Sequence, residues 1–195
     1  MQVRCALVGM PGSGKSTVGK QLAQRLGVPF IDLDHQLELV LKTSIRNFFE
    51  TEGEARFRDL EAQVLADTTA QPGGMVLSTG GGAVLRPENR EVLRQFGNVL
   101  YLRASPEEIF KRVKHDRTRP LLQVNNPLQK LRELYAQRDV LYRDTATYVI
   151  ETGRPTVHTL VNMIMMQLEM APDEQGSADG VQRTNGEPDT PSRGS

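Results

Sequence analysis

The residues with the most specific chemistry lie near the N-terminus, where positions 9–17 have the sequence Gly-Met-Pro-Gly-Ser-Gly-Lys-Ser-Thr. This segment fits G-x-x-x-x-G-K-[ST], whose glycines let backbone N–H groups turn toward anionic oxygen atoms. We expect Lys15 to reach the β- and γ-phosphates of a nucleotide and the Ser16 hydroxyl to bind Mg²⁺. The alternative is an ordinary glycine-rich turn between a strand and a helix. The residues predicted to bind ATP here are Gly12, Ser13, Gly14, Lys15, Ser16 and Thr17.

Two carboxylates follow the second apolar segment of the chain, where Asp32 and Asp34 flank Leu33. In an extended backbone, side chains two residues apart point to the same side, so both carboxylates are expected to face one site. We expect Asp32 to lie nearer the phosphates and their metal ion, and Asp34 nearer the group that accepts the phosphate. The alternative is a structural role as a helix N-cap, which Asp34 alone could fill.

Three consecutive glycines, Gly80, Gly81 and Gly82, follow the third apolar segment. Glycine loses more backbone entropy on folding than any other residue, and a plain turn needs only one or two glycines. The run therefore predicts that a ligand approaches the backbone closely, with the N–H groups as donors.

Two arginines lie in segments with helical spacing. Arg58 is three residues before Glu61 and four after Glu54, whereas Arg138 has no acidic residue at those spacings. Residues three or four apart are neighbours on a helix, so ion pairs explain the first arginine and not the second. The pattern alone favours a surface position for both.

Three further arginines, Arg112, Arg117 and Arg119, lie in or beside the polar segment 114–126, which we expect to be a mobile lid. An arginine on a closing lid can stabilise the charge that develops on a transferring phosphoryl group. The spacing of the residues does not rank Arg117 against Arg119.

The elements that must position these residues alternate between strand and helix patterns. Short segments rich in β-formers predict strands at residues 3–8, 30–33, 75–78, 98–102 and 147–150. Helices are predicted at residues 15–26, 34–42, 54–69, 87–96, 105–114, 126–142 and 156–170, with a short one between 43 and 49. The alternation predicts an α/β fold, a parallel sheet covered by helices on both faces. Ligands bind such sheets beyond the carboxyl ends of the strands, where all three polar segments are expected to converge.

Length and composition predict one domain with a tail. Residues 171–195 contain five acidic and two basic residues, a net charge of −3, so residues 1–170 carry +3 in a chain of zero net charge. The tail has few large apolar residues, and we expect it to be disordered. The excess of +3 is too small to indicate nucleic-acid binding. Four methionines of the last predicted helix are expected to pack in the core; they are Met163, Met165, Met166 and Met170.

Other features of the sequence bear on membrane association, cellular location and oligomeric state. No apolar run approaches the ~18 residues of a membrane span, so no membrane is expected as a partner. The single cysteine, Cys5, excludes an internal disulfide and fits a cytoplasmic location. The absence of sustained heptads favours a monomer.

Taken together, these segments resemble the shikimate kinase family of P-loop enzymes over residues 1–170. The resemblance includes the loop 9–17, Asp32-Leu33-Asp34, the segment 53–61, the three glycines, Arg119-Pro120-Leu121-Leu122, and Arg138 followed by Tyr142. It implies a three-layer α/β/α fold with five parallel strands in the order 2-3-1-4-5. It also implies ATP-dependent phosphorylation of the 3-hydroxyl of shikimate, giving shikimate 3-phosphate and ADP.

The resemblance implies roles for individual residues. Arg58 and Arg138 would hold the carboxylate of shikimate, Asp34 would orient the attacking hydroxyl, and the glycines would line the same pocket. On the nucleotide side, Arg119 would be the lid arginine, Ser16 and (through water) Asp32 would hold Mg²⁺, and Arg112 and Arg154 would border the adenine. The residues so implied are Ser16, Asp32, Asp34, Arg58, Gly80, Gly81, Gly82, Arg112, Arg119, Arg138 and Arg154.

Two classes of alternative stay open at this point. Another small-molecule P-loop kinase, acting on gluconate or on a nucleoside monophosphate, would share Lys15, Ser16 and the lid. A nucleotide-binding module without catalysis would bind ATP but release no ADP in response to an acceptor.

Overall fold

The computed structural model describes residues 2–115 and 123–170 of the chain. The predicted lid arginines Arg117 and Arg119 and the predicted tail at residues 171–195 lie outside the described residues. Most of the predicted lid, residues 114–126, lies outside them as well.

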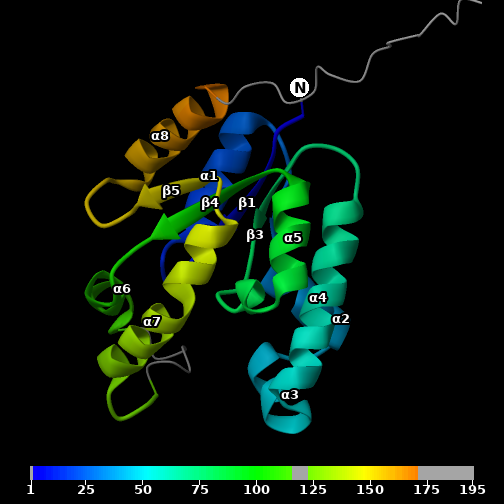
Figure 1. The fold of residues 1–195 in the computed structure, drawn as a ribbon, viewed down its shortest axis with the longest axis vertical. Coiled ribbons are helices and arrows are strands. Elements are labelled where there is room, and N and C mark those ends of the chain that lie inside the picture. Colours follow the sequence, from blue (N-terminus) through cyan, green and yellow to red (C-terminus); the bar gives the residue numbers. More distant parts are fainter. Residues whose placement is uncertain (1, 116–122, 171–195) are drawn as a thin grey trace, which may run out of the picture.

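Five parallel strands form a single sheet in the order β2-β3-β1-β4-β5, as expected (Figure 1). Ala6, in the central strand, lies beside Leu77 on one neighbour and Val99 on the other. The strands are β1 (Arg4–Val8), β2 (Phe30–Asp32), β3 (Met75–Ser78), β4 (Asn98–Arg103) and β5 (Tyr148–Glu151).

The alternation of side chains along β1 divides the core into two layers. Ala6 and Val8 face one layer and Cys5 and Leu7 face the other, and all four are fully buried. Successive side chains of a strand point to opposite faces, so a strand that is apolar throughout must be covered on both sides. Burial raises the pKa of the Cys5 thiol to about 12, which agrees with a packing role for this residue.

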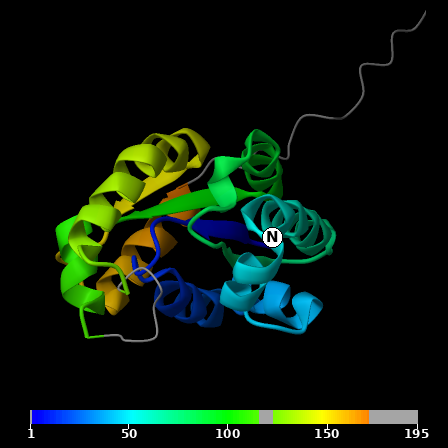
Figure 2. The same ribbon diagram turned by 90° about the horizontal axis from the view of Figure 1, so that it is seen from below.

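Helices cover both faces of the sheet. Figure 2 shows α1 (Lys15–Leu26) and α8 (Val157–Met170) on one face, with α5 (Pro87–Phe96) and α7 (Pro127–Thr145) on the other. The second face also receives α4 (Glu54–Ala70), whose Phe57 and Leu65 pack in the same layer as Tyr142 of α7. The remaining elements are α2 (Leu33–Leu41), α3 (Ile45–Glu52), the 3₁₀ turn η1 (Ala83–Leu85) and α6 (Pro106–Val113).

Most helix boundaries follow from local start and stop signals. Gly27 ends α1 in the left-handed conformation with φ 67°, and its N–H bonds back to the last turn. Ser105 and Glu108 form a capping box at the start of α6. Asn126 accepts a hydrogen bond from the N–H of Gln129 at the start of α7. These side chains satisfy N–H groups that a helix leaves without partners, so they fix where each helix begins.

The core position predicted for the methionines of α8 is wrong for three of the four. Met163, Met166 and Met170 are 42%, 60% and 77% exposed. The buried face of α8 is made instead by Leu160, Val161 and Ile164, with Met165 and Leu168 beside them. Because a helix turns 100° per residue, positions 163, 166 and 170 share the face opposite this buried stripe.

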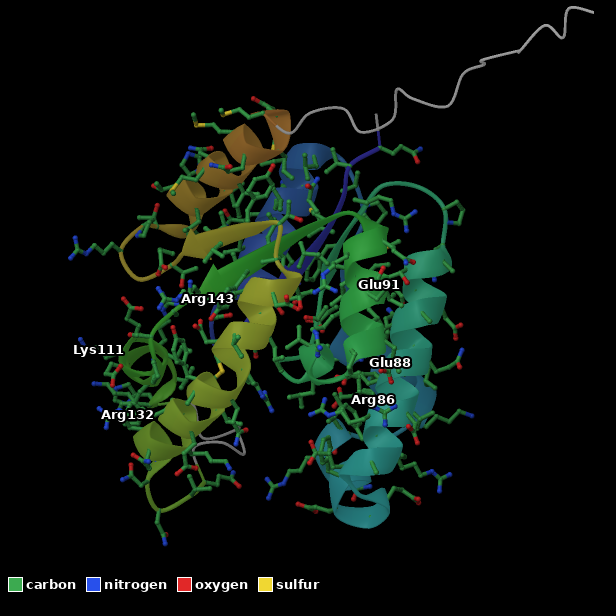
Figure 3. All side chains as sticks on the ribbon, viewed as in Figure 1. Arg86, Glu88, Glu91, Lys111, Arg132 and Arg143 are labelled. Atoms are coloured by element: carbon green, nitrogen blue, oxygen red, sulfur yellow. The ribbon has the colours of Figure 1, made fainter. Side chains whose placement is uncertain are left out.

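Exposed ion pairs join neighbouring helices at the surface. Arg86, labelled in Figure 3, lies 2.6 Å from Asp59 and connects the start of α5 to α4. Arg132, labelled in the same view, lies 2.9 Å from Glu107 and connects α7 to α6. Exposed pairs of this kind contribute at most about 1 kcal/mol each, so the two buried layers hold the helices in place. Among the described residues, no helix is long and apolar enough to cross a membrane.

Candidate active site

The predicted phosphate-binding loop joins the end of β1 to the start of α1. Gly12 and Gly14 have φ values of 82° and 96°, which residues with a side chain rarely adopt. Gly14 is the N-cap of α1 and offers no side-chain acceptor to the first turn of that helix. A helix gives its first N–H groups no intrahelical acceptor, so these groups and the positive end of the helix dipole can bind an anion.

Lys15 occupies the first position of α1 and is buried beside this loop. Its Nζ donates hydrogen bonds to the carbonyl oxygens of Gly9 and Met10, each at 2.9 Å, and the residue is 8% exposed. The ammonium group is thus held inside the curve of the loop, where the sequence pattern places a phosphate contact.

The two aspartates differ in conformation from the prediction. The backbone does not stay extended through residue 34, because α2 begins at Leu33. Asp32, and not Asp34, is the N-cap: its Oδ1 accepts hydrogen bonds from the N–H groups of Asp34 at 3.0 Å and of His35 at 3.4 Å. Leu33 is fully buried in the first turn of the helix, which anchors that turn against the sheet. The cap and this buried leucine start the helix one residue earlier than predicted.

Capping leaves the second oxygen of Asp32 available to the site. Its Oδ2 accepts a hydrogen bond of 2.8 Å from the hydroxyl of Ser16. The structural and functional interpretations of this residue are therefore compatible, since one oxygen caps α2 while the other faces the loop. A carboxylate and a hydroxyl side by side are oxygen ligands of the kind that Mg²⁺ prefers.

A cavity of about 230 Å³ at the carboxyl ends of β1, β2 and β3 brings together many of the predicted residues, although Arg58, Gly82 and Arg138 are not in its lining. It is lined by the loop, both aspartates and the residues that follow β3, namely Pro11, Gly12, Gly14, Lys15, Ser16, Thr17, Asp32, Asp34, Ser78, Thr79, Gly80 and Gly81. The three polar segments therefore meet at one edge of the sheet, as expected for this fold class.

Asp34 lies in the first turn of α2, where charges of both signs act on it. Desolvation raises the pKa of its carboxyl, the charge of Asp32 raises it further, and Lys15 and Arg58 oppose the rise. Asp34 keeps substantial solvent exposure, so a hydroxyl group entering the cavity can reach it. A carboxylate whose pKa is raised accepts a hydrogen bond or a proton more readily than a free aspartate does.

Arg58 is not the surface residue that its spacing favoured. Its side chain is 12% exposed and lies 2.7 Å from Glu61, whose side chain is 1% exposed. Glu54 lies 3.4 Å away and is mostly exposed. The guanidinium carbon is 5.3 Å from the centre of the Phe57 ring, which shields one face of the cation.

Glu61 is a residue of the site that sequence reasoning missed. Burial raises the pKa of its carboxyl, and the charge of Arg58 and a hydrogen bond from it counteract that rise. Its spacing from Arg58 was visible in the sequence, but the spacing did not reveal that the pair is buried. The pair fixes the orientation of the Arg58 guanidinium beside Gly82.

The three glycines make room for the side chains of the site itself. None of the three has a positive φ, so backbone freedom does not explain them. A Cβ on Gly80 would lie 2.7 Å from Oδ1 of Asp34, and one on Gly82 would overlap the guanidinium of Arg58. A Cβ on Gly81 would lie 2.7 Å from Pro11 and 3.3 Å from a terminal nitrogen of Arg138. The groups that approach these glycines are thus side chains of the protein itself, and the predicted close approach of a ligand stays a prediction.

Two arginines from different helices therefore meet at the glycine segment. Arg58 comes from α4 and Arg138 from α7, which lie on the same face of the sheet near η1 (Figure 1). The Nε atom of each is buried and has no hydrogen-bond partner in the described part of the chain. Two guanidinium groups with unused donors are suited to a carboxylate, which accepts paired hydrogen bonds from such forks.

The residues predicted to border the adenine lie on the other side of the loop. Arg112, in α6, donates to the carbonyl oxygens of Ser13 at 3.3 Å and of Thr152 at 2.6 Å. It therefore ties the phosphate-binding loop to the segment after β5. Arg154 is exposed in that same segment. Contact of either arginine with a nucleotide stays a prediction.

Comparisons with known proteins agree with this geometry. A family model described as shikimate kinase matches residues 11–169. The shikimate kinase of Paracidovorax citrulli is 57% identical over 172 residues, 87% of this chain and 94% of that protein. A solved shikimate kinase from Acinetobacter baumannii, in complex with shikimate, is 44% identical with a TM-score of 0.82, covering 87% of this chain and 94% of that chain.

A gluconokinase from Sinorhizobium meliloti aligns less well, with a TM-score of 0.55 and 17% identity, over 86% of this chain and 92% of that chain. That likeness shows a shared fold only. The family model and the close relatives cover most of the chain, and the model includes residues 11–17 of the loop, both aspartates, the glycines and Arg138. The chain therefore belongs to the shikimate kinase family.

Proposed function

We propose that the cavity at the carboxyl edge of the sheet transfers the γ-phosphoryl group of ATP to the 3-hydroxyl of shikimate, giving shikimate 3-phosphate and ADP. The observation that carries this proposal is the meeting of two arginines, each with a buried and unpartnered Nε atom among the described residues, at the glycine segment beside a cavity lined by Lys15 and Asp34. Shikimate offers both groups that such a site requires, a carboxylate for the arginines and hydroxyls for the aspartate. The solved relative from Acinetobacter baumannii, which contains shikimate, supports the same assignment.

On the acceptor side, Arg58 and Arg138 hold the carboxylate of the substrate. The carboxylate thereby fixes the ring, and Asp34 accepts a hydrogen bond from the attacking hydroxyl and orients it. The glycine segment lines this pocket and keeps the ring close to the backbone. Fixed orientation of the two reacting groups lowers the entropic part of the barrier.

On the nucleotide side, the N–H groups of the loop bind the phosphates and Lys15 stabilises the negative charge that develops during transfer. Arg119 adds a second positive charge from the lid; this role rests on the family resemblance alone. Arg112 and Arg154 border the adenine.

Mg²⁺ is the metal ion that we propose to accompany ATP. The described residues include no group of three or more His, Cys, Asp or Glu side chains that could hold a metal by itself. The Ser16–Asp32 pair fits Mg²⁺ nevertheless, because this ion commonly takes only one or two protein oxygens besides phosphate and water. Ser16 would bind it directly and Asp32 through water, and the ion would neutralise charge on the phosphate oxygens.

We further propose that residues 1–170 form the kinase domain and that the chain acts as a cytoplasmic monomer. The family model ends at residue 169, close to the end of α8.

Replacing Arg58 with alanine tests the acceptor pocket. We expect the KM for shikimate to rise and kcat/KM to fall by at least about 30-fold, since removing one partner of a desolvated charge pair costs about 2 kcal/mol or more. The KM for ATP should change little. Steady-state kinetics with each substrate varied in turn measures both constants.

Arg56→Ala is the matched control, because Arg56 lies on the same helix in an exposed pair with Glu52. It should leave both KM values unchanged. Thermal unfolding of each variant confirms that the assay temperature lies below its transition. An unchanged KM for shikimate in Arg58→Ala would contradict the proposed pocket.

A further inference from the structure

The two arginines of the proposed carboxylate site are held in place by different means. Arg58 is fixed by the buried carboxylate of Glu61 at 2.7 Å. Within residues 2–115 and 123–170, no acidic side chain lies within ion-pair distance of Arg138. The position of Arg138 therefore depends on the helix that carries it, on that helix's contacts and on the neighbouring side chain of Tyr142.

Tyr142, one helical turn later on α7, interacts with Arg138 directly, because the charge of Arg138 and a hydrogen bond from it counteract the rise that burial causes in the pKa of the Tyr142 phenol. The Tyr142 hydroxyl donates a hydrogen bond of 2.6 Å to the carbonyl oxygen of Gly81, and the residue is fully buried. Residues four apart lie on the same face of a helix, so Tyr142 and Arg138 both face the glycine segment. Burial raises the pKa of the Tyr142 phenol to about 12, so the hydroxyl keeps its proton at neutral pH.

The hydrogen bond between Tyr142 and Gly81 therefore also affects the close contact between Gly81 and Arg138. It holds the Gly81 carbonyl, and Arg138 packs so tightly against Gly81 that an added Cβ would lie 3.3 Å from its guanidinium. A shift of α7 relative to Gly81 would change the distance between Arg138 and Arg58, because Arg58 packs against the adjacent Gly82.

A second contact ties the same turn of α7 to the sheet. Asp139 accepts a hydrogen bond of 2.7 Å from the hydroxyl of Tyr101 in β4 and another of 2.8 Å from Arg143, which is labelled in Figure 3. The rings of Tyr101 and Tyr142 pack with their centres 5.0 Å apart. The two tyrosines thus form a continuous connection from β4 through α7 to the glycine segment.

We propose that Tyr142 is a positioning residue for substrate binding: its hydroxyl fixes α7 against Gly81 so that Arg138 meets the carboxylate at the correct distance from Arg58. This inference rests on the proposed function, because it assumes that the two arginines bind the acceptor. It adds to that function a residue that lies outside the nucleotide loop and acts through the geometry of Arg138.

Tyr142→Phe tests the inference, because it removes the hydroxyl and leaves the ring packed against Tyr101. A neutral hydrogen bond with a buried acceptor contributes enough that we expect the KM for shikimate to rise roughly 5- to 10-fold. The KM for ATP should stay within about twofold of the wild-type value, since the loop is untouched. Tyr148→Phe, which removes a phenol from β5, is the matched control and should change neither constant.

A double-mutant cycle with Arg138→Ala separates positioning from general destabilisation. If Tyr142 acts through Arg138, Tyr142→Phe should cause no further rise in the KM for shikimate once the arginine is gone. Equal effects of Tyr142→Phe with and without Arg138, or no effect of Tyr142→Phe on the wild-type background, would overturn the inference. Should Tyr142→Phe fail to fold, Tyr101→Phe tests the placement of α7 by removing the hydrogen bond from β4 to Asp139. The KM for shikimate should again rise, and the KM for ATP should not.

Failure of this inference is distinguishable from failure of the proposed function. If shikimate does not stimulate ADP release by the wild-type protein, the proposed function is wrong and the inference falls with it. If shikimate stimulates the wild type and Tyr142→Phe has wild-type constants, only the positioning role is wrong.

Discussion

Replacing Lys15 with alanine should lower kcat by about 10²- to 10³-fold, the range found when a preorganised group that stabilises transition-state charge is removed. The ammonium group lies within the curve of the phosphate-binding loop, 2.9 Å from the carbonyl oxygens of Gly9 and Met10. During phosphoryl transfer, negative charge shifts onto the leaving oxygen, and a methyl group cannot stabilise it. We expect the KM for ATP to rise as well, while the KM for shikimate changes little.

Lys20→Ala is the matched control, because Lys20 is an exposed lysine of the same helix. It should keep wild-type kinetics. Initial rates of ADP release at saturating shikimate measure kcat for both variants. A Lys15→Ala variant with kcat near the wild-type value would show that the loop does not take part in phosphoryl transfer.

The second large effect is expected for Asp34→Asn, which should lower kcat by about 10²-fold or more, as losing a group that assists proton transfer typically does. The amide has the size of the carboxyl group but carries no charge and accepts a proton poorly. The attacking hydroxyl would then be bound without a strong acceptor, so kcat should fall more than the KM for shikimate rises. Asp67→Asn, an exposed aspartate on α4, is the control.

The pH dependence of kcat/KM gives an independent measurement of the same residue. Desolvation and the charge of Asp32 raise the pKa of Asp34, so this carboxylate becomes protonated at a higher pH than an ordinary aspartate. As the pH falls through that raised pKa, activity should be lost in the wild-type protein. In Asp34→Asn, the loss of activity attributable to this group should be absent. An unchanged profile and an unchanged kcat would mean that Asp34 does not contact the reacting hydroxyl.

The architecture follows closely from the sequence because its signals are local. The strand patterns, the glycine at the end of α1 and the capping box at Ser105 act within a few residues of each other. The alternation of strands and helices predicts a parallel sheet covered on both faces. The strand order 2-3-1-4-5 came from the family resemblance, and the structure confirms it.

The details that the sequence did not predict depend on contacts between distant segments. The spacing of Arg58 and Glu61 is the same whether a helix face is exposed or buried, so their burial became visible only once α4 packed against the sheet. The exposure of three methionines on α8 depends likewise on which face of that helix meets α1. The early start of α2 is a local feature. Both Asp32 and Asp34 are residues that can cap a helix, and the cap is Asp32, whereas Asp34 was the residue considered from the sequence.

The glycine segment has a structural cause that the sequence did not reveal. The run of three glycines predicts close approach of a ligand, whereas the groups that the structure places against it include Asp34, Arg58 and Arg138 from three different helices. No sequence spacing relates these residues to one another. The family resemblance supplied the grouping, and the packing supplies a physical reason for it.

The most direct test of the central claim is ADP release with ATP and Mg²⁺ in the presence of shikimate, gluconate, a nucleoside monophosphate or no acceptor. We predict strong stimulation by shikimate, little or none by the other acceptors, and formation of shikimate 3-phosphate in amounts equal to the ADP released. Stimulation by gluconate or by a nucleotide instead would keep the phosphate-binding loop and contradict the proposed acceptor pocket. ADP release that no acceptor changes would contradict the assignment of the cavity as the active site of a shikimate kinase.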